Sequence, residues 1–181
     1  MKFGIGQPVT RKEDPKFLMG KGRYVGDIEV PNMVYGYVLR SPHANAQINS
    51  IDVSAAQKAP GVIVALTGDD YAADDMGHIA CATMMPMLMG GQEGVQRPHG
   101  ALVSDVVKCV GAPVAFVVAE TLEQAKDAAE LIEVDYESLP AVSSTAQARE
   151  ADASLVWEGT ENNKSFTYKI GNVPGVEEEI G

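Results

Sequence analysis

Cysteine is scarce in this sequence, and so are long apolar runs. The 181 residues include two cysteines, Cys81 and Cys109, which are too few for the disulfide framework of a small secreted domain. The opening residues MKFGIGQPVTRKEDPK lack the apolar segment of a secretory signal. No window reaches the roughly eighteen consecutive apolar residues of a spanning helix. We therefore expect a reduced, cytoplasmic protein without a membrane span.

Basic charge is also low, because 14 Lys and Arg stand against 25 Asp and Glu, a net charge of -11. This balance lacks the basic footprint of a nucleic-acid binder, so we expect no nucleic-acid partner. The N-terminal arm, residues 1–31, differs from the acidic body that follows. The basic residues of the first forty positions are Lys2, Arg11, Lys12, Lys16, Lys21, Arg23 and Arg40, against Glu13, Asp14, Asp27 and Glu29.

Sequence motifs of catalysis and cofactor binding are missing as well. The chain has no GxSxG nucleophile elbow, no P-loop and no HExxH. The Gly-rich runs GIGQPV and GKGRYVGD neither follow a strand nor open an amphipathic helix, so we interpret both as turns. The acidic pairs Asp69 with Asp70 and Asp74 with Asp75 are interpreted as surface charge in solvated loops. We predict no catalytic, cofactor-binding or metal-binding residue in this chain.

The remaining reactive side chains are isolated. His43, His78 and His99 each lack a Cys, Ser or carboxylate at a catalytic spacing, and we interpret His43 in SPHA as a turn residue rather than a ligand. The run MMPMLM, Met84 to Met89, is interpreted as interface filler rather than a copper site. No CxxC or zinc spacing is present, and Cys109, beside three valines, is expected to be a small buried residue.

The most organised stretch is GAPVAFVVAETLEQAKDAAELIEVDY, Gly111 to Tyr136. Its apolar run PVAFVVA predicts a buried strand, and IEVDY predicts another. Between them, Thr121 and Gln124 have the spacing of a capping box, which predicts a helix from Leu122 to about Leu131. Apolar residues at spacings of three and four predict its buried stripe. The stripe consists of Leu122, Ala125, Ala128, Ala129 and Ile132.

Shorter signals precede this stretch. Strands are predicted at Met33 to Ser41 and at AQINSIDV, and Ser54 is expected to cap a short helix AAQKA. VIVAL then predicts a buried strand, and TGDD a turn. Residues 71–98 show no period and predict a long surface excursion, a type of segment that commonly contacts partners.

The last part of the sequence is less regular. Residues 143–154 are small and polar, and KSFTYKI is compatible with a strand. The final NVPGVEEEIG has the start signals of a helix that is too short to be stable alone, so we interpret it as an element cut short. Without any family resemblance, the residues alone predict a soluble α+β domain with no self-contained active site.

Three long motifs carry a resemblance. GIGQPVTRKEDPKFLMGKGRYVGDI, VLRSPHANAQINSIDVSAAQKAPGVIVALTGDD and VGAPVAFVVAETLEQAKDAAELIEVDYESLPAV, in this order and spacing, resemble the opening of the large subunits of the xanthine dehydrogenase, aldehyde oxidase and carbon monoxide dehydrogenase family. The resemblance covers residues 3 to about 142. It implies an α/β-hammerhead domain, an α+β unit with a mixed sheet and a few helices, preceded by an extended arm.

The resemblance also implies a place in a larger molybdenum hydroxylase. The complete subunit would be an oxidoreductase acting on aldehydes, N-heterocycles or carbon monoxide with a molybdopterin (molybdenum) cofactor. Its partners would be iron-sulfur and flavin subunits that carry iron-sulfur clusters and FAD. No position here matches the family's Gly-rich cofactor loops or catalytic glutamate, so this segment alone is expected to bind no cofactor and to be inactive.

The organisation that follows has three parts. We expect an N-terminal arm at residues 1–31, the hammerhead domain at 32–142, and a connector at 143–181 toward a missing molybdopterin-binding domain. The chain is then the N-terminal structural and docking domain of a large subunit, truncated or one part of a split subunit. The alternative is a free-standing interaction or assembly module derived from that domain. The N-terminal arm and the surface excursion at residues 71–98, which contains the Met-rich run Met84 to Met89, are the surfaces that we expect to contact partners.

Overall fold

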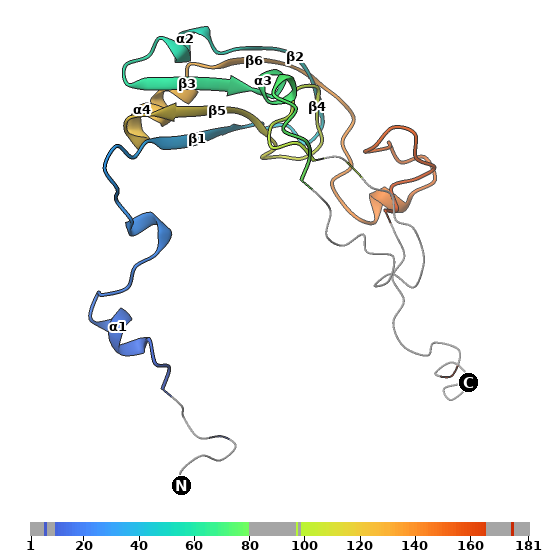
Figure 1. The fold of residues 1–181 in the computed structure, drawn as a ribbon. Helices are drawn as coiled ribbons and strands as arrows, with labels where there is room; N and C mark the ends of the chain where they lie inside the picture. Colours follow the sequence, from blue (N-terminus) through green and yellow to red (C-terminus); the bar gives the residue numbers. More distant parts are fainter. Residues whose placement is uncertain (1–5, 7–9, 80–96, 98, 166–174, 176–181) are drawn as a thin grey trace. The chain divides into compact units, whose positions relative to one another are not determined.

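The computed structural model describes residues 6, 10–79, 97, 99–165 and 175. It divides the chain into two units, Met1–Met33 and Val34–Gly181, and each is considered by itself (Figure 1). The predictions for Cys81, the Met-rich run and most of KSFTYKI lie outside the described residues, as does nearly all of the C-terminal helix. No helix among the described residues is long and apolar enough to cross a membrane.

The N-terminal unit has little internal packing. It contains the helix α1 (Asp14–Leu18) and the 3-10 turn η1 (Val25–Asp27), and neither element has a buried residue. The rings of Phe17 and Tyr24 stack with centroids 5.8 Å apart, which links the two elements. We expected an extended arm and missed α1, because five residues are too few to display a helical period.

Three strands of the second unit form the first sheet, in the order β1-β5-β3. Its members are β1 (Tyr35–Arg40), β5 (Pro113–Ala119) and β3 (Val62–Thr67), and both pairings are antiparallel. The three predicted strands are confirmed. β5 lies in the centre because its run of small and branched apolar residues suits a strand that has neighbours on both edges.

The second sheet has the order β4-β2-β6 and is also antiparallel. It consists of β4 (Val106–Val107), β2 (Ala46–Asp52) and β6 (Glu133–Ser138). The α+β class is confirmed, but two antiparallel sheets replace the mixed sheet that we expected. The reason is that each strand-helix-strand unit, β2-α2-β3 and β5-α4-β6, places its two strands in different sheets, so no parallel pair forms.

The helix α4 (Leu122–Ala129) covers one face of the first sheet and contacts β1 and β5 (Figure 1). Its capping box is confirmed: Thr121 N donates to Gln124 Oε1 at 3.0 Å, and Gln124 N donates to Thr121 Oγ1 at 3.2 Å. Four residues of the predicted stripe are buried, whereas Leu122, at the open first turn, is half-buried. The buried members of the stripe are Ala125, Ala128, Ala129 and Ile132.

Two local predictions were wrong. Ser54 is not a cap but the first residue of α2 (Ser54–Gln57), and its N–H donates to Asp52 Oδ1 at 2.8 Å. TGDD is not a turn, since it begins the helix α3 (Gly68–Ala73). There Thr67 N donates to Asp70 Oδ2 at 2.7 Å and Asp70 N donates to Thr67 Oγ1 at 3.4 Å, a capping box like that of α4 with a carboxylate in place of the amide.

The hydrophobic core has two parts. The larger lies between α4, α2 and the first sheet, and alanines dominate it: Ala56, Ala65, Ala115, Val117, Ala119, Ala125, Ala128, Ala129 and Ile132. The smaller joins the second sheet to the start of β5 through Ala46, Ile48, Val107, Ala112 and Val114. The small side chains let the helix lie close to the strands, so packing rather than surface charge holds these layers together.

Candidate functional site

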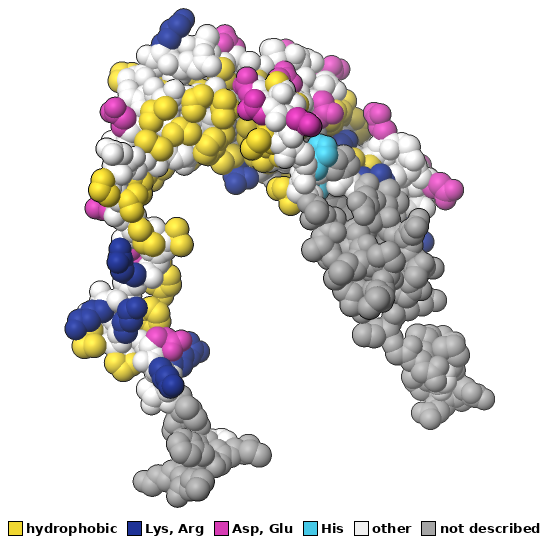
Figure 2. Space-filling model, in the orientation of Figure 1, with side chains coloured by type: hydrophobic (Ala, Val, Ile, Leu, Met, Phe, Trp, Pro, Cys, Tyr) yellow, Lys and Arg dark blue, Asp and Glu magenta, His cyan; other side chains and the backbone are white. Residues whose placement is uncertain are grey.

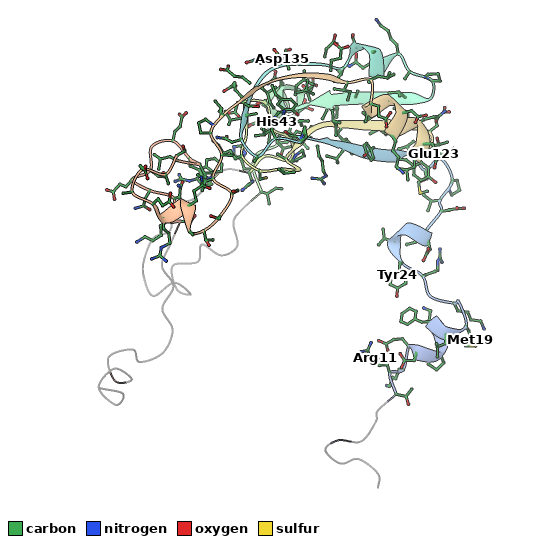
Figure 3. The ribbon with its side chains drawn as sticks, turned by 180° about the vertical axis from the view of Figure 1, so that it is seen from behind. Arg11, Met19, Tyr24, His43, Glu123 and Asp135 are labelled. Carbon is green, nitrogen blue, oxygen red and sulfur yellow. The ribbon has the colours of Figure 1, made fainter. Side chains whose placement is uncertain are left out.

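The singled-out histidines occupy two different places. His43 follows β1, and its backbone N donates to Ser41 Oγ at 3.1 Å, which confirms its role in a turn. The ring of His43, which is labelled in Figure 3, packs 4.7 Å from the Tyr136 ring of β6, and its Nδ1 lies 3.4 Å from Ser138 Oγ. These contacts place the turn after β1 against the second sheet, and they leave His43 in a packing role.

His78 and His99 are brought together by the fold, although sequence reasoning treated them as unrelated. Ile79 N donates to His99 O at 2.7 Å in an isolated bridge, and both histidines line one cavity of about 420 Å³. Cys109 lines it too. That residue is exposed, so the prediction of burial was wrong: β4 ends at Val107, and the chain turns at Cys109, whose O accepts from Ala112 N at 3.2 Å.

The cavity is bounded by α3, the β4 region and the single tryptophan of the chain, Trp157. Lys108 Nζ lies 4.8 Å from the ring centre of Trp157 and the Arg97 guanidinium carbon 5.5 Å from it, both within the range of cation–π attraction. The His99 ring meets Trp157 edge-on at 6.2 Å. Because Lys108 Nζ also donates to Val156 O at 2.9 Å, this cluster attaches the segment around residue 157 to the domain.

The donor set of the described residues does not fit a molybdenum cofactor. Among them, no three His, Cys, Asp or Glu side chains gather closely enough to hold a metal ion. No buried side-chain nitrogen or oxygen in the same residues lacks a hydrogen-bond partner. Asp70, one of the acids that we placed in a loop, is used as a helix cap. We derive no reaction step from these residues.

The outward face of the second sheet is acidic. Glu133, Asp135 and Glu137 alternate along β6 and are exposed (Asp135 is labelled in Figure 3), while Val134 and Tyr136 pack against the smaller core. Asp52 of β2 pairs with Glu133 and extends this row. Hydrogen bonds from the backbone N–H and then the hydroxyl of Ser54 lower the pKa of Asp52 below its ordinary value. Because its exposed side chains are charged, this face of the second sheet is suited to exposure to solvent.

The face of the first sheet that α4 does not cover is apolar instead. Strand register places Phe116 and Val118 of β5 beside Val38 of β1 and beside Val64 and Leu66 of β3. We name these five residues the open face. All five are half-buried, and none belongs to either core. Figure 2 shows hydrophobic side chains gathered over β3, β5 and β1 on this side.

The ring of Phe116 fills the space that a glycine leaves on the neighbouring strand β1. It lies over Gly36 of β1, so closely that a Cβ at position 36 would overlap the ring. The backbone of Gly36 does not have the positive φ that favours glycine, which means that the ring and not the conformation requires it. Sequence reasoning missed this face, because a fully apolar strand does not reveal which of its two sides is covered.

The comparison with protein families gives one assignment. Residues 19–140 match the model of the aldehyde oxidase and xanthine dehydrogenase a/b hammerhead domain. The carbon monoxide dehydrogenase large chain of Afipia carboxidovorans is 37% identical over 186 aligned positions, which cover 96% of this chain and 22% of that relative. The chain therefore spans about a fifth of that relative's length.

Solved structures contain the same fold within longer chains. The crystal structure of quinoline 2-oxidoreductase from Pseudomonas putida 86 matches 82% of this chain and 18% of its own, with a TM-score of 0.70 and 42% identity. A Cu,Mo-CO dehydrogenase in its carbon monoxide reduced state matches 98% of this chain and 22% of its own, with a TM-score of 0.73 and 33% identity. In both, the matching unit is a minor part of the chain.

Proposed function

Because the chain belongs to the aldehyde oxidase and xanthine dehydrogenase family through its α/β-hammerhead domain, we propose that it is the N-terminal structural and docking domain of a molybdenum hydroxylase large subunit. The observation that carries this proposal is the match of residues 19–140 inside relatives about five times longer. The complete enzyme is then a cytoplasmic oxidoreductase whose substrate is an aldehyde, an N-heterocycle or carbon monoxide. This chain is a truncated subunit or one part of a split subunit.

In this proposal the chemistry and the scaffold are separate. The molybdopterin cofactor is held by polypeptide beyond these residues, and iron-sulfur clusters and FAD are held by partner subunits. The described part of residues 32–142 supplies a rigid body, since β5 has neighbours on both edges and its small apolar side chains pack under α4. Residues 143–181 connect this body to the cofactor-binding part, and Trp157 attaches the connector through Lys108.

The N-terminal arm is proposed to bind another part of the enzyme. None of its described residues is buried, and the side chains of Leu18 and Val25 are 86% and 87% exposed. Basic side chains lie among these apolar ones (Figures 2 and 3). An arm without a core gains order only when another surface covers its apolar residues, so we propose that the arm docks on the cofactor-binding part.

Assembly in the native host tests this function. The chain is tagged at its C-terminus in its chromosomal locus, purified, and analysed for bound polypeptides and for molybdenum. We expect it to co-purify with molybdopterin-binding, iron-sulfur and flavin polypeptides, and the 181-residue chain purified alone to contain no stoichiometric molybdenum. Deletion of residues 1–31 is expected to weaken the co-purification.

Two outcomes oppose the proposal. Turnover of an aldehyde or N-heterocycle by the isolated chain would place the reaction centre in these residues and refute the division of roles. Co-purification with proteins that contain no molybdenum, flavin or iron-sulfur cluster would favour the free-standing interaction module. Limited proteolysis gives an independent readout, because rapid cleavage near residues 84–90 in the assembled enzyme would argue against burial of the Met-rich run.

A further inference from the structure

We infer that the open face (Val38, Val64, Leu66, Phe116 and Val118) is the surface on which the molybdopterin-binding part of the same large subunit docks. This inference rests on the function proposed above and assigns the contact to one face of one sheet. The occupant is an apolar surface of that cofactor-binding part, permanently bound.

The first step is that the open face is not part of the domain's own core. Each face of a three-stranded sheet needs a cover if its side chains are apolar. The side of β5 that carries Ala115, Val117 and Ala119 is covered by α4, α2 and strands of the second sheet. The opposite side, with Phe116 and Val118, packs against neither core.

The second step is the contrast between the two sheets. The second sheet also has a face turned away from the core, and there the exposed side chains are Glu133, Asp135 and Glu137. On the corresponding side of the first sheet, the described strands carry one charged residue, Arg40 at the end of β1, and its guanidinium donates to Gly111 O at 2.8 Å. Alternation of inward apolar and outward polar residues is the usual pattern of a sheet exposed to water, and only the second sheet shows it. The first sheet has the pattern of one covered on both sides.

The third step concerns the kind of occupant. A face whose single charge lies at its edge gives little electrostatic selection among transient partners, whereas permanent interfaces resemble a domain core cut in half. The far end of the Phe116 ring lies over Gly36, a position of β1 on this side that has no side chain. The permanent neighbour that the comparisons supply is the remaining polypeptide of the longer relatives, of which this unit forms 22% and 18% in two solved chains.

A matched pair of substitutions tests the inference. Val118→Lys places a charge on the open face, and Val110→Lys makes the same change in a turn whose side chain is 68% exposed. Each variant is introduced into the tagged chromosomal copy, and the molybdopterin-binding polypeptide recovered with it is measured. We expect Val118→Lys to reduce recovery about tenfold or more, because docking would bury an unpaired ammonium. Val110→Lys is expected to leave recovery unchanged.

Cross-linking keeps the inference testable if Val118→Lys fails to fold. Phe116 is replaced by para-benzoylphenylalanine, which retains an aromatic ring at this position, and the assembled enzyme is irradiated. We expect a cross-link to the molybdopterin-binding part, located by mass spectrometry. The same photoreactive residue at Glu137, on the acidic face, is the control and is expected to give no cross-link to that part.

The outcomes separate this inference from the proposed function. If the wild-type chain recovers the molybdopterin-binding polypeptide and Val118→Lys, folded as judged by circular dichroism, recovers it equally, the inference is overturned and the proposed function stands. If the wild-type chain recovers none, both fail. A cross-link from position 116 to a second copy of this chain, or to an iron-sulfur or flavin subunit, assigns the open face to that occupant and overturns the inference.

Discussion

Lys108 Nζ lies 4.8 Å from the ring centre of Trp157 and donates a hydrogen bond to Val156 O at 2.9 Å. A single lysine thus makes two contacts with the segment that follows the hammerhead strands. Trp157 is the only tryptophan in the chain, so its fluorescence reports on this attachment without interference.

Lys108→Met is predicted to loosen the segment around Trp157. The substitution keeps the aliphatic stem but removes the cation and the hydrogen bond, each of which contributes on the order of 1 kcal/mol. We expect the emission maximum of Trp157 to move to longer wavelength and thermolysin to cleave near Leu155 faster. Lys126→Met, on the exposed side of α4, is the control. Identical spectra for the two variants would contradict the assigned role.

Gly36→Ala is predicted to destabilise the domain, because its Cβ would overlap the ring of Phe116. Overpacking of this kind costs about 1 to 3 kcal/mol in the free energy of unfolding, measured by urea denaturation. The double variant Gly36→Ala with Phe116→Leu should lose less stability than the sum of the single changes, since the smaller side chain relieves the overlap. Additive losses of stability would mean that the Phe116 ring is not the reason why position 36 requires glycine.

Val107→Ala and Val110→Ala compare one substitution in two environments. Val107 is 0% exposed in the smaller core, whereas Val110 is 68% exposed. We expect Val107→Ala to reduce the free energy of unfolding by about 1.5 to 3 kcal/mol through lost burial and the cavity left behind. Val110→Ala should change it by less than about 0.5 kcal/mol. Equal effects would show that β4 is not packed as described.

Thr121→Ala is predicted to weaken α4 by removing the oxygen that accepts from Gln124 N. Loss of an N-cap of this type costs about 0.5 to 2 kcal/mol. Thr121→Ser keeps the hydroxyl and should retain nearly all of the stability. Chemical denaturation of both variants makes the comparison, and a Thr121→Ser loss as large as that of Thr121→Ala would indicate that the methyl group, and not the cap, matters.

Asp52 is predicted to make the folding stability depend on pH in the acidic range. Its folded pKa is lowered, first by the Ser54 N–H and second by the Ser54 hydroxyl, so the ionised form is favoured in the folded state. The contribution of Asp52 to folding stability is complete at pH values above its unfolded pKa, about 3.9. It is lost as the pH falls through the lower pKa of the folded state. NMR titration should place Asp52 below the ordinary value, and Ser54→Ala should raise it. A midpoint unaffected by Ser54→Ala would contradict the role of the hydroxyl.

The sequence predicted those parts of the fold whose signals are local. The capping box of Thr121 and Gln124, the alanine stripe of α4 and the apolar run of β5 can each be identified within about ten residues, and each was confirmed. The α3 helix was missed although Thr67 and Asp70 also form a capping box. It is only six residues long, and no apolar period accompanies the cap.

The site features depended on distant contacts and were predicted less well. Cys109 was expected to be buried because valines flank it, but burial depends on where the pairing of β4 with β2 ends, and it ends at Val107. His78 and His99 line one cavity only because Ile79 bridges to His99 across a long stretch of sequence. No local spacing contains that information.

By itself, the sequence determined the longer strands, the helix α4, the α+β class and the family resemblance, because periodicity, capping and motif order are properties of neighbouring residues. Only the tertiary structure decided that β2 and β3, and likewise β5 and β6, belong to different sheets. It also decided that Phe116 lies over Gly36 and that Phe116 and Val118 of β5 belong to neither core of the described residues. The physical reason is that a strand presents side chains to both faces, and which face is buried depends on what the rest of the chain places against it.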